Sequence, residues 1–203
     1  MKKSKAETAQ TRKRIVDVAS QAFRGHGIDA TGVAEIMSEV GLTHGGFYRH
    51  FESKEQLVFE AIAKSLDDLV VASQDAAEQG VEAIVKHFQN YVSPAYRDDI
   101  EHGCPLAANG SELVRADDAT RRSATEAFQK IFGSLAPYIR RQKGEDGNDA
   151  AMNVLTNMIG ALTMSRVVDD PELSERILRV TRDRIAKMVN LPASKASAAA
   201  AMA

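Results

Sequence analysis

The sequence predicts an all-α fold, with a group of short helices near the amino end and a longer helical body after it. Apolar residues recur at intervals of three and four through most of the 203 residues, which is the spacing of one helix face. The alternation of apolar and polar residues that is typical of strands is absent, and only five prolines interrupt the chain. With 44% hydrophobic residues, the chain also has enough apolar side chains to build a core.

The first two predicted helices are short and are bounded by glycines. The first has an apolar stripe over 15–23 and ends in the glycine-rich stretch 25–27. In the second, Thr31 is placed to cap the amino end, and the apolar stripe covers 33–40. Gly41 then permits the left-handed turn that commonly ends a helix.

A third short helix and a longer fourth one follow. Thr43 is placed to cap the third helix, whose inward side chains include Phe47. Ser53, followed three residues later by a glutamine, has the spacing of a capping box and predicts a helix that runs to about Gln79. Beyond Gly80, further helices are expected over 81–95, 105–115, 118–143, 147–169 and 172–190.

Three short helices in such close succession have the proportions of a helix-turn-helix unit, in which one helix enters the major groove of DNA. The supporting core is expected to consist of Phe23, Ile36, Val40, Leu42, Phe47 and Phe51. The outward face of the third helix is expected to present Thr43, His44, Gly45, Gly46, Tyr48, Arg49 and His50. None of these is a carboxylate, which suits a surface that faces phosphates. A three-helix packing unit without a DNA-binding role remains an alternative on the pattern alone.

The charge of the chain is unevenly distributed, although the formal net charge is only −2. Residues 1–14 contain six Lys and Arg and one Glu, whereas the residues from 61 onward are net acidic. A basic arm over 1–14 predicts a polyanionic partner at this end of the molecule. The alternative is a solvated terminus with no partner.

The segment 31–57 is T-G-V-A-E-I-M-S-E-V-G-L-T-H-G-G-F-Y-R-H-F-E-S-K-E-Q-L. It resembles the amino-terminal signature of the tetracycline-repressor (TetR) family of transcriptional regulators, and the resemblance covers about residues 8–60. It implies a homodimer that binds a palindromic double-stranded operator and leaves it when an unknown small-molecule effector enters the carboxyl-terminal part. By position, it also implies phosphate contacts for Thr31 and Lys54 and groove contacts for the face of the third helix. Arg49 departs from the family pattern, in which many members have a second aromatic residue.

The resemblance also implies a division into domains. A helix-turn-helix DNA-binding domain is expected over 1–52, an effector-binding and dimerisation domain over 53–191, and a flexible tail over 192–203. Two apolar stripes near the carboxyl end would pack against a second copy as a four-helix bundle, or else against their own body. The expected interface residues are Val154, Leu155, Met158, Ile159, Leu162, Ile177, Leu178, Thr181 and Ile185.

An effector pocket is expected among the middle helices, although ordinary core placement is the alternative for each of its residues. The candidates are Phe88, Tyr91, Cys104, Asn109, Phe128 and Phe132. Cys104 precedes Pro105, which suits a first helical position, so the thiol is expected at a helix N-cap, where the helix dipole favours the thiolate. This suggests an alternative function as a thiol-based electrophile or oxidant sensor; the other possibility is a buried cap residue.

Other function classes are disfavoured by what the sequence lacks. The five histidines show no paired metal-ligand spacing, and a single cysteine cannot build a thiolate-rich zinc site, so neither a metal nor a cofactor is expected. There is no nucleophile elbow or phosphate-binding loop, so an enzyme is not expected. No apolar run is long enough to span a membrane and no secretory signal is evident, which predicts a cytoplasmic protein without a membrane partner. A non-specific architectural DNA-binding protein remains the rival interpretation.

Overall fold

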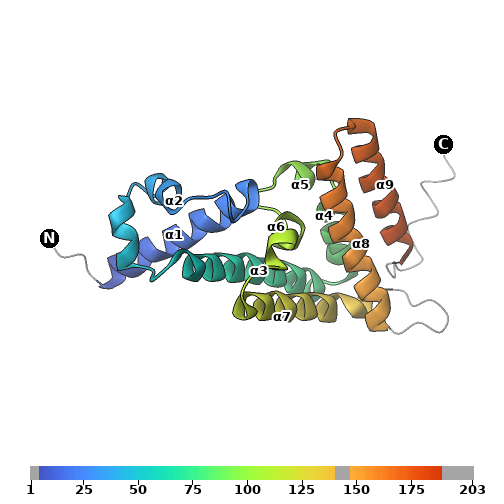
Figure 1. Cartoon of the computed structure of the whole chain (residues 1–203). Helices are drawn as coiled ribbons and strands as arrows, with labels where there is room; N and C mark the ends of the chain where they lie inside the picture. Colours follow the sequence, from blue (N-terminus) through green and yellow to red (C-terminus); the bar gives the residue numbers. More distant parts are fainter. Residues whose placement is uncertain (1–4, 140–146, 189–203) are drawn as a thin grey trace.

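The computed structural model describes residues 5–139 and 147–188, and all regular structure in these ranges is helical (Figure 1). The all-α prediction is therefore confirmed for this part of the chain. The elements are α1 (Lys5–His26), α2 (Val33–Glu39), the 3-10 helix η1 (His44–Arg49), α3 (Lys54–Glu78), α4 (Val81–Tyr91), α5 (Pro94–Asp98), α6 (Pro105–Leu113), α7 (Asp118–Leu135), the 3-10 turn η2 (Ala136–Tyr138), α8 (Gly147–Val167) and α9 (Pro171–Met188). The predicted tail over 192–203 lies outside the described residues.

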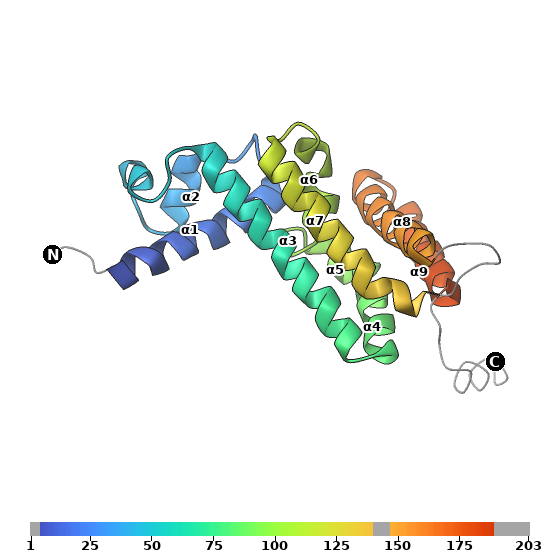
Figure 2. The same ribbon diagram turned by 90° about the horizontal axis from the view of Figure 1, so that it is seen from below.

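The helices form two parts that are connected through α3. At one end of the molecule, α1, α2 and η1 lie together, and α3 runs from them along the body (Figure 1). In Figure 2, α3 and α7 lie side by side, and α8 and α9 form a pair next to them. Because α3 also packs against α1, it contacts both the amino-terminal group and the body.

The amino-terminal group is built around the predicted small core. Its buried members are Phe23, Ile36, Val40, Phe47 and Phe51, and Leu42 is half-buried. The turn after α2 has the expected glycine geometry. Gly41 has a φ of +72°, and its N–H donates to the Ser38 carbonyl, while the Leu42 N–H donates to the Met37 carbonyl.

The caps agree with the sequence at Ser53 but not at Thr31. The Ser53 hydroxyl accepts a hydrogen bond from the Gln56 N–H at 3.2 Å and begins α3 as predicted. The N-cap of α2 is Gly32, so the predicted cap at Thr31 is wrong. The Thr31 hydroxyl instead donates to the Gly27 carbonyl at 2.6 Å, which ties it to the end of α1.

Three predicted segments differ in detail. The third segment is a 3-10 helix and not an α-helix, with i to i+3 bonds from the Gly46 N–H to Thr43 and from the His50 N–H to Phe47. Two adjacent glycines of low helix propensity favour this tighter, short form. The expected helix over 81–95 is divided because Ser93 caps a new helix that has Pro94 in its first turn. The expected helix over 118–143 ends at Leu135, just before the η2 turn.

Within the described ranges, no helix combines the length and the hydropathy that crossing a membrane requires.

Candidate nucleic-acid interface and ligand pocket

The η1 segment presents a polar surface on a buried aromatic base. Phe47 is 1% exposed and stacks on Phe51 with ring centroids 5.4 Å apart, which anchors the segment from behind. Tyr48 is 67% exposed, and its ring is nearly perpendicular to the rings of Phe47 and His44, with centroids 5.3 and 6.0 Å away. Thr43, His44, Gly45 and Arg49 are also exposed, and Gly46 and His50 are partly buried. The residues that the sequence predicts for the outward face thus lie together in the structure, and the segment 43–50 contains no carboxylate.

Arg12 holds this segment in place from α1, a role that the sequence does not reveal. Its Nε donates to the His50 carbonyl at 3.2 Å, and its terminal nitrogens pair with the carboxylate of Glu60 on α3. The guanidinium carbon lies 4.4 Å from the centroid of the Phe51 ring, which is a cation–π arrangement. The hydrogen bonds to Glu60 raise the pKa of Arg12 above its usual value. Arg12 is therefore an internal connector and not a free cation of the basic arm.

The rest of the basic arm is helical where the structure describes it. Residues 5–14 of the predicted arm form the first turns of α1. Lys5, Lys13 and Arg14 are exposed and supply positive charge on the same end of the molecule as η1. Lys2 and Lys3 lie outside the described residues.

The two predicted phosphate contacts outside η1 are engaged within the protein. The Thr31 side chain has no exposed surface, so the expectation that it meets a phosphate is wrong in this conformation. Lys54 is half-buried, and its Nζ donates to the Ile28 carbonyl at 2.8 Å, which holds the turn after α1 against the start of α3. Both residues shape the DNA-facing part from inside.

The buried position of Thr31 leads to a first prediction. Thr31→Val removes the donor to Gly27 and should lower the free energy of unfolding by about 1–2 kcal/mol in urea denaturation. Thr43→Val is the matched control, because the exposed Thr43 hydroxyl makes no capping bond, and its effect should stay within about 0.5 kcal/mol. Equal losses in the two variants would contradict the assignment of Thr31 to the interior.

A small internal cavity lies among α3, α4, α6, α7 and α8. It includes three of the six predicted pocket residues, Tyr91, Cys104 and Phe128. Phe88 lines a separate small cavity between α4 and α9, and Phe132 packs beside Phe128 at the edge of the core. Neither Phe88 nor Phe132 lines the cavity that contains Tyr91, Cys104 and Phe128.

Cys104 occupies the predicted N-cap of α6, with Pro105 in the first turn. The thiol is buried, at 1% exposure, and burial raises its pKa above the ordinary value. The expectation that the helix dipole favours the thiolate is therefore wrong, because desolvation outweighs the backbone amides of Leu106 and Ala107. His102 does not assist, since its Nδ1 lies 2.8 Å from the Asp99 carboxylate at the surface.

Asn109 is not a pocket residue but a contact between α6 and the amino-terminal group. It is fully buried, and its Nδ2 donates to the Phe23 carbonyl of α1 at 2.7 Å and to Glu112 at 3.1 Å. Glu112 in turn accepts from the N–H groups of Ile28 at 2.7 Å and Asp29 at 3.1 Å. The turn between α1 and α2 is thus hydrogen-bonded to α6.

Most of the predicted dimer-interface residues face inward. Those that are at most 6% exposed within a single chain are Val154, Leu155, Met158, Leu162, Leu178 and Ile185. Ile159, Ile177 and Thr181 are partly buried. Leu155, Met158, Leu162 and Leu178 pack against their own body within the single chain, which is the alternative that the sequence left open, and the interface assignment stays a prediction.

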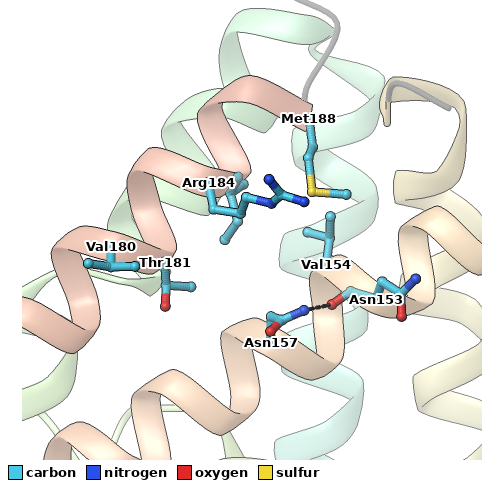
Figure 3. A pocket seen from close by; sticks show the side chains of 8 residues that line it. Asn153, Val154, Asn157, Val180, Thr181, Arg184 and Met188 are labelled. Carbon is cyan, nitrogen blue, oxygen red and sulfur yellow. Dashed lines mark hydrogen bonds between the residues drawn. The ribbon is translucent and has the colours of Figure 1, made fainter. Parts of the chain in front are cut away.

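The outer face of α8 and α9 is unusually apolar for an exposed surface. Of the nine exposed large apolar side chains in the described residues, five lie on these two helices: Met152, Met164, Val167, Leu173 and Val180. A groove of about 360 Å³ runs between the helices, with Val154 and Ile185 as its floor and Asn157, Val180 and Arg184 among its rim residues (Figure 3).

The long helix α1, followed by the short α2 and the exposed, carboxylate-free η1, has the arrangement of a helix-turn-helix DNA-binding unit. Residues 15–61 match the family model for bacterial regulatory proteins of the tetR family, and residues 80–179 match that of the LmrA/YxaF-like transcriptional regulator C-terminal domain. The chain is 31% identical over 166 residues to the transcriptional regulator LmrA of Bacillus subtilis (strain 168), covering 76% of this chain and 86% of LmrA. The chain belongs to the TetR family of bacterial transcriptional regulators, which are DNA-binding proteins and not enzymes.

Two further likenesses agree with this membership. The transcriptional repressor DhaR of Mycobacterium sp. (strain GP1) is 25% identical over 176 residues, covering 83% of this chain and 89% of DhaR. The crystal structure of reduced NemR from E. coli superposes with a TM-score of 0.75 at 16% identity, covering 91% of this chain and 99% of NemR, which supports the fold.

Proposed function

We propose that this regulator acts in the cytoplasm as a repressor that binds a palindromic operator as a homodimer and is released by a small-molecule effector. The observation that carries the proposal is the exposed η1 surface on its buried aromatic base. Relatives named as repressors, such as DhaR, support the direction of regulation.

The DNA contacts are assigned to η1 and its flanks. Tyr48, His44 and Arg49 are exposed side chains with hydrogen-bonding groups, which suits the edges of bases and nearby phosphates. Gly45 and Gly46 let the backbone approach DNA closely, and Thr43 and His50 stand at the two ends of the segment. Thr31 and Lys54 support this surface through the hydrogen bonds described above.

The dimer is assigned to the outer face of α8 and α9. On α8, the exposed residues Asn153, Asn157, Gly160, Met164 and Val167 follow one another at alternating steps of four and three. On α9, the exposed Leu173, Val180 and Arg184 and the partly buried Ile177 are spaced in the same way. Such steps mark a single helix face, and two copies of the pair would form a four-helix bundle. A two-fold axis there would set the two η1 segments about 34–36 Å apart, one turn of DNA.

Effector release is assigned to α6, because this helix contacts both the cavity and the DNA-binding part. Its amino end, with Cys104 and Leu106, lines the cavity. Its other end holds the α1–α2 turn through Asn109 and Glu112. A ligand that displaces the first turn of α6 would therefore move the segment that positions α2 and η1.

This connection leads to a second prediction. Glu112→Ala removes the acceptor of the Ile28 and Asp29 amides, and hydrogen exchange at these two amides should become about tenfold faster. Glu126→Ala, at an exposed position on α7, is the control and should leave their exchange unchanged. Unchanged protection in Glu112→Ala would remove α6 from the proposed pathway.

The proposal as a whole is tested by selecting bound sequences from random duplex DNA. Recovery of a palindrome would support a specific dimeric regulator. Binding without sequence preference would favour the architectural alternative. The thiol-sensor alternative is not retained, because the thiol of Cys104 is buried and its pKa is raised.

A further inference from the structure

The internal cavity is lined almost entirely by apolar groups. Its walls come from five helices and the N-cap of α6, and the lining residues are Leu69, Ser73, His87, Tyr91, Cys104, Leu106, Phe128, Ile131, Leu155, Met158 and Ile159. None of them is an Asp, Glu, Lys or Arg. The cavity measures about 20 Å³, room for a single water molecule in this conformation.

Two polar side chains on one face of α4 stand out in this lining. Tyr91 is 6% exposed, and its hydroxyl lies beside the Cys104 thiol without making a hydrogen bond of good geometry to any described residue. His87, one turn earlier, makes no hydrogen bond within the described residues, and burial lowers its pKa, which favours the neutral imidazole. By contrast, the Ser73 hydroxyl is satisfied by the Leu69 carbonyl at 2.9 Å. A buried hydroxyl that makes no hydrogen bond lowers the stability of the folded protein, so the Tyr91 hydroxyl is available to hydrogen-bond to a polar group of a ligand.

A second, larger space adjoins the cavity. It measures about 220 Å³ and shares Leu69, His87 and Tyr91 with the inner cavity. Its outer wall includes the α1 residue Arg24, whose guanidinium donates to the Ser65 hydroxyl and the Glu101 carbonyl. Arg24, which is itself buried, and Asp68 are thus part of the lining of the second space, whereas the inner cavity has no Asp, Glu, Lys or Arg.

We propose that the joined cavity binds a small, neutral, largely apolar ligand with one hydroxyl or carbonyl group that hydrogen-bonds to Tyr91 and His87. This inference rests on the proposed function, since it names the chemical class of the effector. A charged group that entered the inner cavity would lose its hydration among walls that contain no Asp, Glu, Lys or Arg. A wholly apolar ligand would leave the Tyr91 hydroxyl unpaired, so a site of this kind discriminates in favour of the polar group.

The size of the ligand follows from the two volumes. A one-ring molecule does not fit the inner cavity alone, so the side chains of His87 and Tyr91, which line both spaces, would have to rotate and join the two. Entry through the second space would carry the ligand past Arg24 of α1, next to the part of the protein that positions η1.

The test measures binding of three matched probes to the full chain by calorimetry, without DNA. 4-Methylphenol, which is neutral at pH 7, should bind about tenfold more tightly than toluene, and 4-methylbenzoate should bind most weakly. Tyr91→Phe should lower the affinity for 4-methylphenol about tenfold and leave that for toluene unchanged. Tyr138→Phe is the matched control, because the Tyr138 hydroxyl donates to the Ala77 carbonyl at 2.6 Å, away from the cavity lining. It should change neither affinity.

Several results would overturn the inference. These are 4-methylbenzoate binding as tightly as 4-methylphenol, an unchanged 4-methylphenol affinity in Tyr91→Phe, or no binding of any probe. Operator binding is measured separately, by mobility shift on the selected DNA. If the predictions for the three probes fail while the protein still binds the palindrome, only the ligand class is refuted. If the protein shows no sequence preference for DNA, the proposed function itself is refuted.

Discussion

Tyr48→Ala is expected to lower operator affinity by about 10- to 100-fold, because one well-placed base or phosphate contact is worth about 1–3 kcal/mol. Tyr48 is 67% exposed, and its ring packs nearly perpendicular to that of Phe47, which is itself buried in the core. The hydroxyl is therefore presented by a rigid base and not by a mobile loop. Quantitative mobility shift against the selected palindrome measures the loss.

The controls separate DNA contact from folding. Circular dichroism and molecular mass should be unchanged in Tyr48→Ala, since the side chain contributes little to the core. Phe59→Ala truncates another exposed aromatic residue, 36% exposed on α3 outside the 43–50 segment, and should leave affinity within about twofold. If Tyr48→Ala binds the operator with wild-type affinity, η1 is not the segment that contacts the bases.

The double change Met164→Asp and Val180→Asp is expected to give a monomer and to lower operator affinity by at least about 100-fold. Both side chains lie on the outer face of α8 and α9, and each would bring a charge into the interface without a partner. A monomer binds each half-site separately and loses the gain in effective concentration, which is commonly 10²- to 10⁴-fold. Light scattering after gel filtration gives the mass, and mobility shift gives the affinity.

Val114→Asp is the matched control for this change. Val114 is 70% exposed on the segment just after α6, so an added carboxylate there tests the general effect of surface charge. It should remain a dimer with unchanged operator affinity. A dimer in the double variant, or a monomer in Val114→Asp, would move the interface away from α8 and α9.

The helix boundaries were largely predictable because they depend on local chemistry. Gly41 ends α2 through its positive φ, and Ser53 starts α3 through its hydroxyl. Cys104 and Pro105 begin α6 in the same local way. These signals act within one turn of the chain, so the sequence alone is sufficient to read them.

The candidate site was less predictable, because the decisive contacts join distant segments. Arg12 and Glu60 are 48 residues apart, and Glu112 and Ile28 are 84 apart, so no spacing rule indicates either pair. Thr31 resembles a cap, but tertiary packing directs its hydroxyl to the preceding helix.

On α8 both faces are partly apolar, and periodicity does not decide which face turns inward. Only the packed structure assigns Met158 to the core and Met164 to the surface.

Because Glu60 already neutralises Arg12, this guanidinium displaces no condensed counterion when the protein binds DNA. The number of phosphate contacts is obtained from the slope of the logarithm of the affinity against the logarithm of the salt concentration. This number would then be about one lower per subunit than the number of Lys and Arg side chains in α1 suggests.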